Sequence, residues 1–206
     1  SHSAMVLDKG LVAWCEDRSR SEVWGVLVDL PGRACASLGD RLVPFLRWAL
    51  ENGGHATRLD FALDDREGRV TLDRILDAES EGRIVSRWRG LTMIQRRYKG
   101  KIEGWTCYLG SRQSQAMVRI YDKAAEQRSK GHEVEGAWVR FELEAKSDFA
   151  DRLGRGFFQR GSVAVIEQVN RRLRFVERSG ADTNMRRAPV ASWWSEFIGS
   201  VVPGPS

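Results

Sequence analysis

Three stretches of the chain alternate between apolar and polar residues, and this alternation constrains the fold more than any other feature. They are residues 57–64 (TRLDFALD), 117–123 (MVRIYDK) and 138–144 (WVRFELE). Successive side chains of a strand point to opposite faces, so each stretch has one apolar and one charged face. Strands of this kind form antiparallel sheets with one face on the core and the other in solvent. The sequence therefore predicts an α+β fold, in which helices cover the apolar face of one largely antiparallel sheet.

The charged face of this predicted sheet has an unusual composition. It carries Asp60, Asp64, Tyr121, Glu142 and Glu144, whereas the covered face carries Leu59, Phe61, Leu63, Val118, Ile120, Phe141 and Leu143. Acidic residues are depleted from strands, so carboxylates on two separate strands require an explanation. One explanation is a solvated face with cross-strand ion pairs, such as Arg140 with Asp60. The other is a carboxylate cluster that binds a divalent cation beside a tyrosine.

The 206-residue chain has a formal net charge of +5, which suits a polyanionic partner without specifying one. Basic residues are concentrated between residues 83 and 105, where Trp88, Tyr98 and Trp105 are interleaved with them. Basic groups hold phosphates, while aromatic rings stack on unpaired bases. A solvated, charged hairpin explains the same segment equally well.

Cysteine usage and hydropathy indicate the compartment. The three cysteines are odd in number and lack the spacing of a metal site, which argues for free thiols in a reducing setting. No stretch approaches the ~20 apolar residues that cross a bilayer, and no signal peptide is evident. We therefore expect a cytoplasmic protein without a membrane partner. Residues 1–4 are typical of a cloning remnant and are excluded from the predicted domain.

Four motifs resemble, in order and spacing, those of the replication initiation factor family (Rep_trans). They are residues 58–64 (RLDFALD), 108–112 (YLGSR), 118–123 (VRIYDK, with Glu126 following) and 138–144 (WVRFELE). The resemblance covers about residues 23–147. It implies a palm-like sheet related to the HUH nucleases. The family contains the initiators of rolling-circle plasmids and phages, together with relaxases of conjugative elements.

The activity that the resemblance implies is metal-dependent nicking and joining of one DNA strand at a specific origin, which initiates rolling-circle replication. The resemblance places the nucleophile at Tyr121, which would form a 5′-phosphotyrosine link. A phenol with a pKa near 10 is a weak nucleophile at neutral pH. A nearby cation favours the phenolate. Arg119 and Lys123 flank Tyr121 on its strand face and are the predicted activating cations.

The resemblance also places metal-binding acids at Asp60 and Glu142. Asp64 and Glu144 are either further ligands or groups that orient neighbouring arginines. The chain has no His-apolar-His pair, so the imidazole metal site of HUH enzymes is absent. An all-carboxylate site favours Mg²⁺ or Mn²⁺. The predicted DNA-binding residues are Arg58, Arg112, Arg140, Arg96 and Arg97.

Three alternatives remain open at the level of sequence. A relaxase would nick the transfer origin of a mobile element by the same chemistry. A water-using nuclease would keep Tyr121 as a structural residue, and a non-catalytic module would only bind single-stranded DNA. The expected partner is a single-stranded or hairpin origin site in DNA, with a helicase and a second copy of the chain as further candidates.

Local patterns complete the prediction. We expect a strand over residues 23–30, a helix over 35–52, a hairpin around Gly100 and Gly104, and an amphipathic helix over 162–176. The predicted nicking domain spans residues 5–178. Residues 179–206 are expected to form a loop, a C-terminal helix that packs on the domain, and a disordered tail. Trp193 and Trp194 of that helix are predicted to be core or docking contacts.

Overall fold

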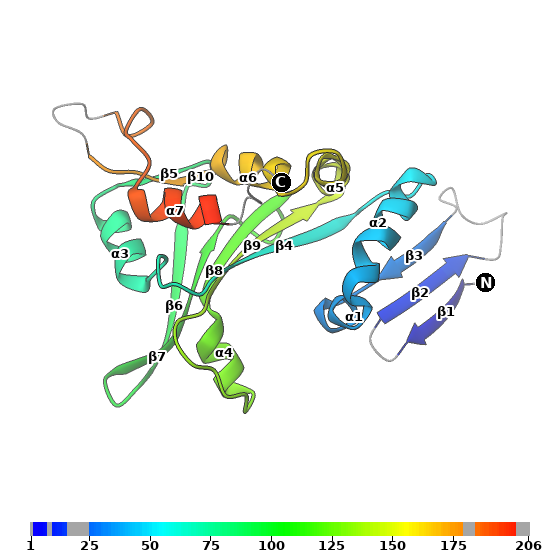
Figure 1. Ribbon diagram of the computed structural model, residues 1–206, viewed down its shortest axis with the longest axis horizontal. Helices are drawn as coiled ribbons and strands as arrows, with labels where there is room; N and C mark the ends of the chain where they lie inside the picture. Colours follow the sequence, from blue (N-terminus) through cyan, green and yellow to red (C-terminus); the bar gives the residue numbers. More distant parts are fainter. Residues whose placement is uncertain (1, 8–9, 16–24, 179–183, 201–206) are drawn as a thin grey trace. The chain divides into compact units, whose positions relative to one another are not determined.

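The computed structural model describes residues 2–7, 10–15, 25–178 and 184–200. The chain forms two compact units, which divide between Gly54 and His55 (Figure 1). The predicted span of 5–178 therefore contains a division that no sequence pattern indicated. The predicted boundary after residue 178 lies inside the second unit. The tail expected beyond residue 200 lies outside the described residues.

The N-terminal unit consists of a small sheet and the helices that follow it. The antiparallel sheet has the order β1 (His2–Leu7), β2 (Gly10–Cys15), β3 (Val26–Asp29), and the helices are α1 (Gly32–Leu38), a 3-10 helix (Gly39–Arg41) and α2 (Leu42–Glu51). Strand β3 lies within the predicted strand, whereas no sequence pattern indicated β1 or β2. The prediction of one continuous helix over 35–52 is wrong, because Gly39 adopts φ +51° at the end of α1.

The larger unit is built around a five-stranded antiparallel sheet. Its order is β4 (Arg58–Asp65), β9 (Val139–Lys146), β8 (Ala116–Asp122), β7 (Lys101–Leu109) and β6 (Leu91–Tyr98). The three alternating stretches thus form three neighbouring strands. The hairpin of β6 and β7 turns at Lys99 and Gly100, whereas Gly104 lies within β7 and not in the turn.

Helices cover the apolar face of this sheet, and Figure 1 shows α5, α6 and α7 on the same side of it. The helices of the larger unit are α3 (Leu72–Ser80), α4 (Lys123–Ser129), α5 (Ser147–Arg160), α6 (Ser162–Asn170) and α7 (Ser192–Ser200). Val118, Ile120, Phe141 and Leu143 are buried in one common core. The predicted α+β fold and the predicted covered face are therefore confirmed. Within the described residues, every helix is too short or too polar to cross a membrane.

A second, two-stranded sheet pairs β5 (Ile84–Ser86) with β10 (Leu173–Phe175). The predicted helix over 162–176 is therefore wrong beyond Asn170, where α6 ends. Leu173 and Phe175 are fully buried, whereas Arg174 between them is partly exposed. This alternation is typical of a strand. In the sequence it follows the helical pattern of α6 so closely that the two together predict one continuous helix.

The C-terminal helix α7 completes the core. Trp194 is fully buried and lies against Phe141 of β9, with ring centroids 5.8 Å apart, and against Phe175 of β10 at 4.9 Å. Such aromatic contacts bury large apolar areas and also fix geometry. The prediction that Trp193 and Trp194 are core contacts is confirmed. Helix α7 thus joins the two sheets from their shared apolar side.

Candidate active site

The polar face of the five-stranded sheet brings Tyr121 next to Glu142. Tyr121 lies on the central strand β8, and Glu142 lies on the adjacent strand β9. The register pairs Arg119 with Glu142 and Tyr121 with Arg140. The Tyr121 hydroxyl donates a hydrogen bond of 2.8 Å to Oε1 of Glu142. The predicted nucleophile and one predicted metal ligand are therefore in direct contact.

Arg119 binds the other oxygen of the same carboxylate. Its Nε donates a hydrogen bond of 3.0 Å to Oε2 of Glu142, and its Nη2 contacts the same oxygen. The guanidinium carbon lies 4.6 Å from the centroid of the Tyr121 ring. Glu142 thus faces the tyrosine with one oxygen and the arginine with the other.

The surroundings raise the pKa of Tyr121 well above its ordinary value near 10. Burial is the largest cause, followed by the hydrogen bond to Glu142 and by the charge of Glu142. Arg119 and Arg140 act in the opposite direction and offset the rise only in part. Arg119 thus favours the phenolate as expected of a flanking cation, but burial and Glu142 outweigh it. The phenol needs a base to accept its proton.

Lys123 lies near Tyr121, but its charge is paired elsewhere. Strand β8 ends at Asp122, whose Oδ1 accepts a hydrogen bond of 2.7 Å from the backbone N–H of Ala125 and so begins α4. Lys123 is therefore a helix residue, and its Nζ forms an ion pair with Glu126. The same Nζ lies 5.6 Å from the centroid of the Tyr121 ring. Of the two predicted activating cations, Arg119 is the one in direct contact with the partner of Tyr121.

The remaining predicted metal ligands are also held by arginines. Arg58 donates hydrogen bonds of 2.9 and 2.8 Å to the two oxygens of Asp60, and one of 2.6 Å to Glu144. Arg140 donates two hydrogen bonds of 2.7 Å to Asp64. The suggested pair of Arg140 with Asp60 is wrong, because the register places Arg140 opposite Asp64.

One cavity of about 320 Å³ brings half of the predicted site residues together, without Tyr121. It is lined by Arg58, Asp60, Tyr108, Arg112, Met117, Arg119, Glu142, Glu144 and Lys146. Asp64 and Arg140 do not line it, although both were predicted site residues. Lys146 is a residue that the prediction missed, and its Nζ lies 2.7 Å from Glu144. The alternation of β9 continues through Lys146, and this pattern could have identified it.

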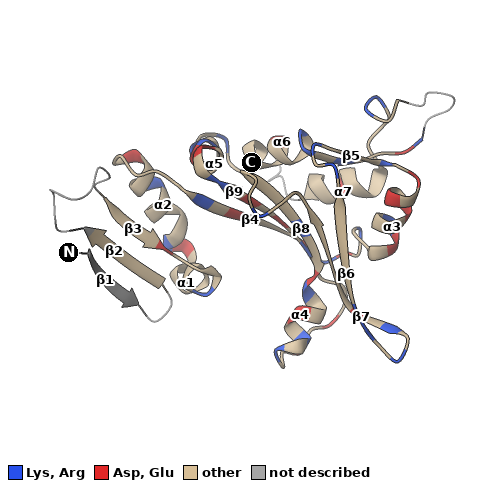
Figure 2. Ribbon diagram, turned by 180° about the vertical axis from the view of Figure 1, so that it is seen from behind, with Lys and Arg blue, Asp and Glu red and all other residues tan. Residues whose placement is uncertain are grey.

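Tyr121 lines a second cavity of about 260 Å³, and Arg119 lines both cavities. Arg96 and Trp105 of the β6–β7 hairpin contribute to this second cavity. Arg97, by contrast, lines neither cavity and donates a hydrogen bond of 3.0 Å to Gln95. Figure 2 shows further basic residues at the tip of the hairpin. Of the predicted DNA-binding arginines, Arg58 and Arg112 thus line the first cavity and Arg96 the second, whereas Arg97 lies elsewhere on the hairpin and Arg140 lines neither cavity.

The predicted metal ligands do not form a metal site in this arrangement. Among the described residues, no group of three Asp, Glu, His or Cys side chains is placed to hold a metal ion. Asp60, Glu142 and Glu144 offer the oxygen donors that Mg²⁺ and Mn²⁺ prefer, but each is bonded to an arginine. These carboxylate oxygens can therefore bind a hard cation only after the arginines release them and bind another anion.

Comparison with known proteins supports one family. The sequence model of the family described as replication initiation factor matches residues 54–203. The chain is 28% identical over 198 residues to the "Putative DNA relaxase NicK" of Bacillus subtilis (strain 168), covering 86% of this chain and 54% of that protein, so it spans about half the length of this relative.

A solved structure shows the same fold. The rolling circle replication initiator protein from Geobacillus stearothermophilus matches with a TM-score of 0.75 at 22% identity, covering 93% of this chain and 76% of that chain. At this identity the match supports the fold alone. The match to the family model, however, extends over well over half of the sequence and includes both Tyr121 and Glu142. The chain therefore belongs to the replication initiation factor family.

Proposed function

We propose that this chain nicks and rejoins one strand of DNA through a covalent bond to Tyr121. The observation that supports this most directly is the hydrogen bond of 2.8 Å from the Tyr121 hydroxyl to Glu142. A tyrosine nucleophile needs a base within hydrogen-bonding distance, and Glu142 is in that position. The raised pKa of Tyr121 makes this base necessary, because little phenolate exists at neutral pH without it.

In the proposed reaction, Glu142 accepts the phenol proton as the tyrosine oxygen forms a bond to phosphorus. The bond from phosphorus to the 3′ oxygen breaks, and the 3′ oxygen leaves as a hydroxyl after taking a proton from solvent. The DNA stays attached through a 5′-phosphotyrosine. The energy of the phosphodiester is retained in this link, so the free 3′ hydroxyl can attack it and rejoin the strand.

The arginines that now hold the carboxylates can instead bind the phosphate. Arginine binds phosphate in a bidentate manner, and Arg58 and Arg119 line the cavity beside Tyr121. Their transfer to phosphate would release Asp60, Glu142 and Glu144, which are the side chains that would hold Mg²⁺ or Mn²⁺. Such an ion would polarise the phosphate and offset its charge. Asp64 lies outside this group and orients Arg140 through its hydrogen bonds.

The β6–β7 hairpin supports an unpaired substrate. Tyr98, Ile94 and Ile102 are exposed by 58%, 55% and 41%, beside the basic residues Arg96 and Arg97. Exposed rings beside cations bind single-stranded nucleic acid, because rings stack on bases while cations contact phosphates. We therefore propose that the substrate is a single-stranded or hairpin site.

Two observations favour further candidates. The similarity to a protein named as a DNA relaxase supports relaxation of a mobile element by the same tyrosine chemistry. The raised pKa of Tyr121 favours a hydrolytic nuclease, in which Glu142 would activate a water molecule instead of the phenol. The rolling-circle initiator and the relaxase differ only in the DNA that they recognise, whereas the hydrolytic nuclease differs in its product.

The experiment incubates the chain with Mn²⁺ and a random-sequence pool of single-stranded oligonucleotides that carry a 3′ fluorophore. A denaturing gel should show a fluorescent protein adduct, because the 3′ fragment stays bonded to Tyr121. Tyr121→Phe keeps the ring but removes the nucleophile, so it should give neither adduct nor cleavage. Cleavage by Tyr121→Phe at the wild-type rate, without an adduct, would establish the hydrolytic nuclease instead.

A further inference from the structure

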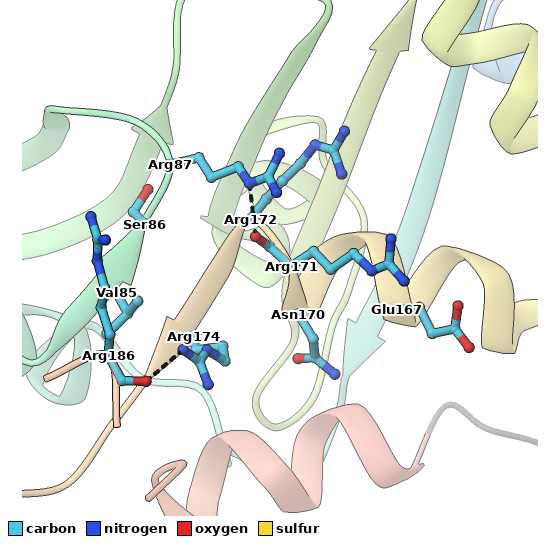
Figure 3. A pocket seen from close by; sticks show the side chains of 9 residues that line it. All are labelled: Val85, Ser86, Arg87, Glu167, Asn170, Arg171, Arg172, Arg174 and Arg186. Carbon is cyan, nitrogen blue, oxygen red and sulfur yellow. Dashed lines mark hydrogen bonds between the residues drawn. The ribbon is translucent and has the colours of Figure 1, made fainter. Parts of the chain in front are cut away.

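A groove rich in arginine lies in the larger unit, where the end of α6 meets β5 and β10. It has a volume of about 910 Å³, and its charged lining residues are Arg87, Glu167, Arg171, Arg172, Arg174 and Arg186. Figure 3 shows these side chains gathered from three parts of the chain. Five cations therefore share one groove with a single carboxylate.

That carboxylate does not neutralise the groove arginines. Arg160, which lies outside the groove lining, donates hydrogen bonds of 3.0 Å to both oxygens of Glu167. Within the described part of the chain, none of the five groove arginines forms an ion pair with an acidic side chain. This differs from the polar face near Tyr121, where each predicted acid is bonded to an arginine. The groove therefore has an excess of positive charge.

Backbone carbonyl groups hold two of the groove arginines in place, and an aromatic ring packs against a third. Arg87 Nε donates 3.1 Å to the carbonyl of Arg171, and Arg174 Nη2 donates 3.1 Å to that of Arg186. The Arg172 guanidinium lies 4.1 Å from the centroid of the Phe149 ring. These contacts orient the cations without cancelling their charge.

The electrostatic effect is visible at Arg172. Burial, and then repulsion from Arg87, Arg152 and Arg171, lower the pKa of Arg172. Like charges held this close repel each other, and a bound anion would relieve the repulsion. The groove therefore suits an anionic ligand.

The groove is separate from the tyrosine site. Its lining residues belong to β5, β10, the end of α6 and the segment near Arg186, and none of them lines the two cavities near Tyr121. Strand β10 buries Leu173 and Phe175 in the core together with Trp194 of α7, on the apolar side of the five-stranded sheet. Tyr121 lies on the opposite, polar face. A ligand of the groove is therefore not the phosphate that Tyr121 attacks.

We propose that this groove binds the sugar–phosphate backbone of duplex DNA beside the cleavage site; this rests on the proposed function for the choice of DNA. Five arginines in about 910 Å³ exceed what one phosphate group requires and match a run of backbone phosphates. Among the described residues that line the groove none is aromatic, so they offer unpaired bases no surface for stacking. Contacts of this kind position a duplex without reading its sequence.

The test compares single arginine substitutions with a matched control. Arg171→Gln and Arg186→Gln each remove one groove charge, and neither side chain has a hydrogen bond to another described residue that would be lost. Arg155→Gln removes one charge from α5 outside the groove, where Arg155 is paired with Asp151 at 2.8 Å. Thermal melting checks that all three variants fold.

Fluorescence anisotropy then measures the affinity for a duplex DNA, its single strand and a duplex RNA of the same sequence over a range of salt concentrations. Each groove substitution should lower the magnitude of the duplex-DNA salt slope by about 0.9, because one phosphate contact is lost. Arg155→Gln should leave the slope unchanged. Equal duplex-DNA salt slopes for the groove and control variants would overturn the proposal. So would an equal loss of slope on the single strand, or a higher affinity of the wild type for duplex RNA than for duplex DNA.

Adduct formation on a short single-stranded oligonucleotide separates this proposal from the proposed function. The groove variants should form the Tyr121 adduct at the wild-type rate. If the wild type forms no adduct, the proposed function fails while the duplex salt slopes still test the groove. If the groove variants lose the adduct on a short single strand, the groove belongs to the reaction itself and the proposal of a separate duplex site is wrong.

Discussion

Asp60 and Glu144 face each other across β4 and β9 and share the guanidinium of Arg58. The register makes them direct cross-strand partners, and Arg58 Nη2 lies 2.8 Å from Asp60 and 2.6 Å from Glu144. Two like charges opposite each other destabilise a sheet unless a cation lies between them. Arg58 supplies that cation in the DNA-free protein.

This relationship predicts how Arg58 affects cation binding. Arg58→Ala should strengthen Mn²⁺ binding, because Asp60 loses its internal cation, Glu144 keeps only Lys146, and the pair can recruit an external cation. Isothermal titration calorimetry without DNA measures the effect. Asp60→Ala in the same background should cancel the gain, and an affinity unchanged by Arg58→Ala would show that these acids are not metal ligands.

Glu142 should control the ionisation of Tyr121. In Glu142→Gln, the charge that raises the pKa of Tyr121 is removed while burial remains. The pKa of Tyr121 should therefore fall towards 10, and the phenolate should appear at lower pH than in the wild type. Ultraviolet absorbance during an alkaline titration, with Tyr121→Phe subtracted, measures this shift.

The same Glu142→Gln variant should lose activity although its tyrosine is more acidic. Removal of a general base slows a reaction by roughly 10²- to 10⁴-fold. The rate of adduct formation at neutral pH should therefore fall by a factor in that range. If another group acted as the base, the rate would stay near that of the wild type. If the pKa of Tyr121 and the rate of adduct formation both fall in Glu142→Gln, then Glu142 acts as a base and not as a purely structural residue.

Arg119 should contribute more than Lys123 to the rate of adduct formation. Arg119 is bonded to Glu142 and lines both cavities beside Tyr121, whereas Lys123 is paired with Glu126. Arg119→Ala should lower the rate of adduct formation by about 10²-fold, the effect typical of removing one group that stabilises developing charge. Lys123→Ala should lower it by less than about tenfold. Single-turnover rates on one cleavable oligonucleotide compare the two, and equal losses would contradict this ranking.

Asp65 should contribute to stability and not to catalysis. Its carboxylate is fully buried at the end of β4 and accepts hydrogen bonds of 2.7 Å from the backbone of Val70 and 3.2 Å from that of Glu67. Asp65→Ala leaves these donors without an acceptor and should lower the free energy of unfolding by about 1–3 kcal/mol. Urea denaturation measures the loss. The exposed Asp77→Ala is the control and should change the stability by no more than about 0.5 kcal/mol.

The alternation of residues predicted the sheet faces well, because the side-chain period of a strand is independent of its neighbours. It placed Tyr121 and Glu142 on one face before any pairing was known. The pairing of Arg140 with Asp64 could not be predicted in this way, because register between β4 and β9 depends on the whole segment that separates them. Lys123 lies at a boundary: the strand alternation can be continued through it, but Asp122 caps α4 and makes Lys123 the first helix residue.

The arginine groove could not be predicted from sequence patterns. Its residues come from 85–87, from 167–174 and from Arg186, and the pairing of β5 with β10 brings the first two segments together. The amphipathic helix expected over 162–176 did not indicate a groove, whereas the strand β10 directs Arg174 away from the buried Leu173 and Phe175. A short strand of three residues has too little periodicity to be distinguished from the end of an amphipathic helix.

Strand β8 is the third of five, with a hydrogen-bonded neighbour on each side. The backbone amides of a central strand exchange with solvent only when the whole sheet opens, whereas those of an edge strand exchange through local fraying. Tyr121 therefore belongs to the most slowly exchanging part of the unit, while Arg119 extends from the same strand on a flexible side chain. Heating should consequently abolish the covalent chemistry and the fold at the same temperature, and no partly opened state would retain a reactive Tyr121. We therefore expect adaptation to the proposed DNA strand to come from the arginines and from the β6–β7 hairpin at the sheet edge.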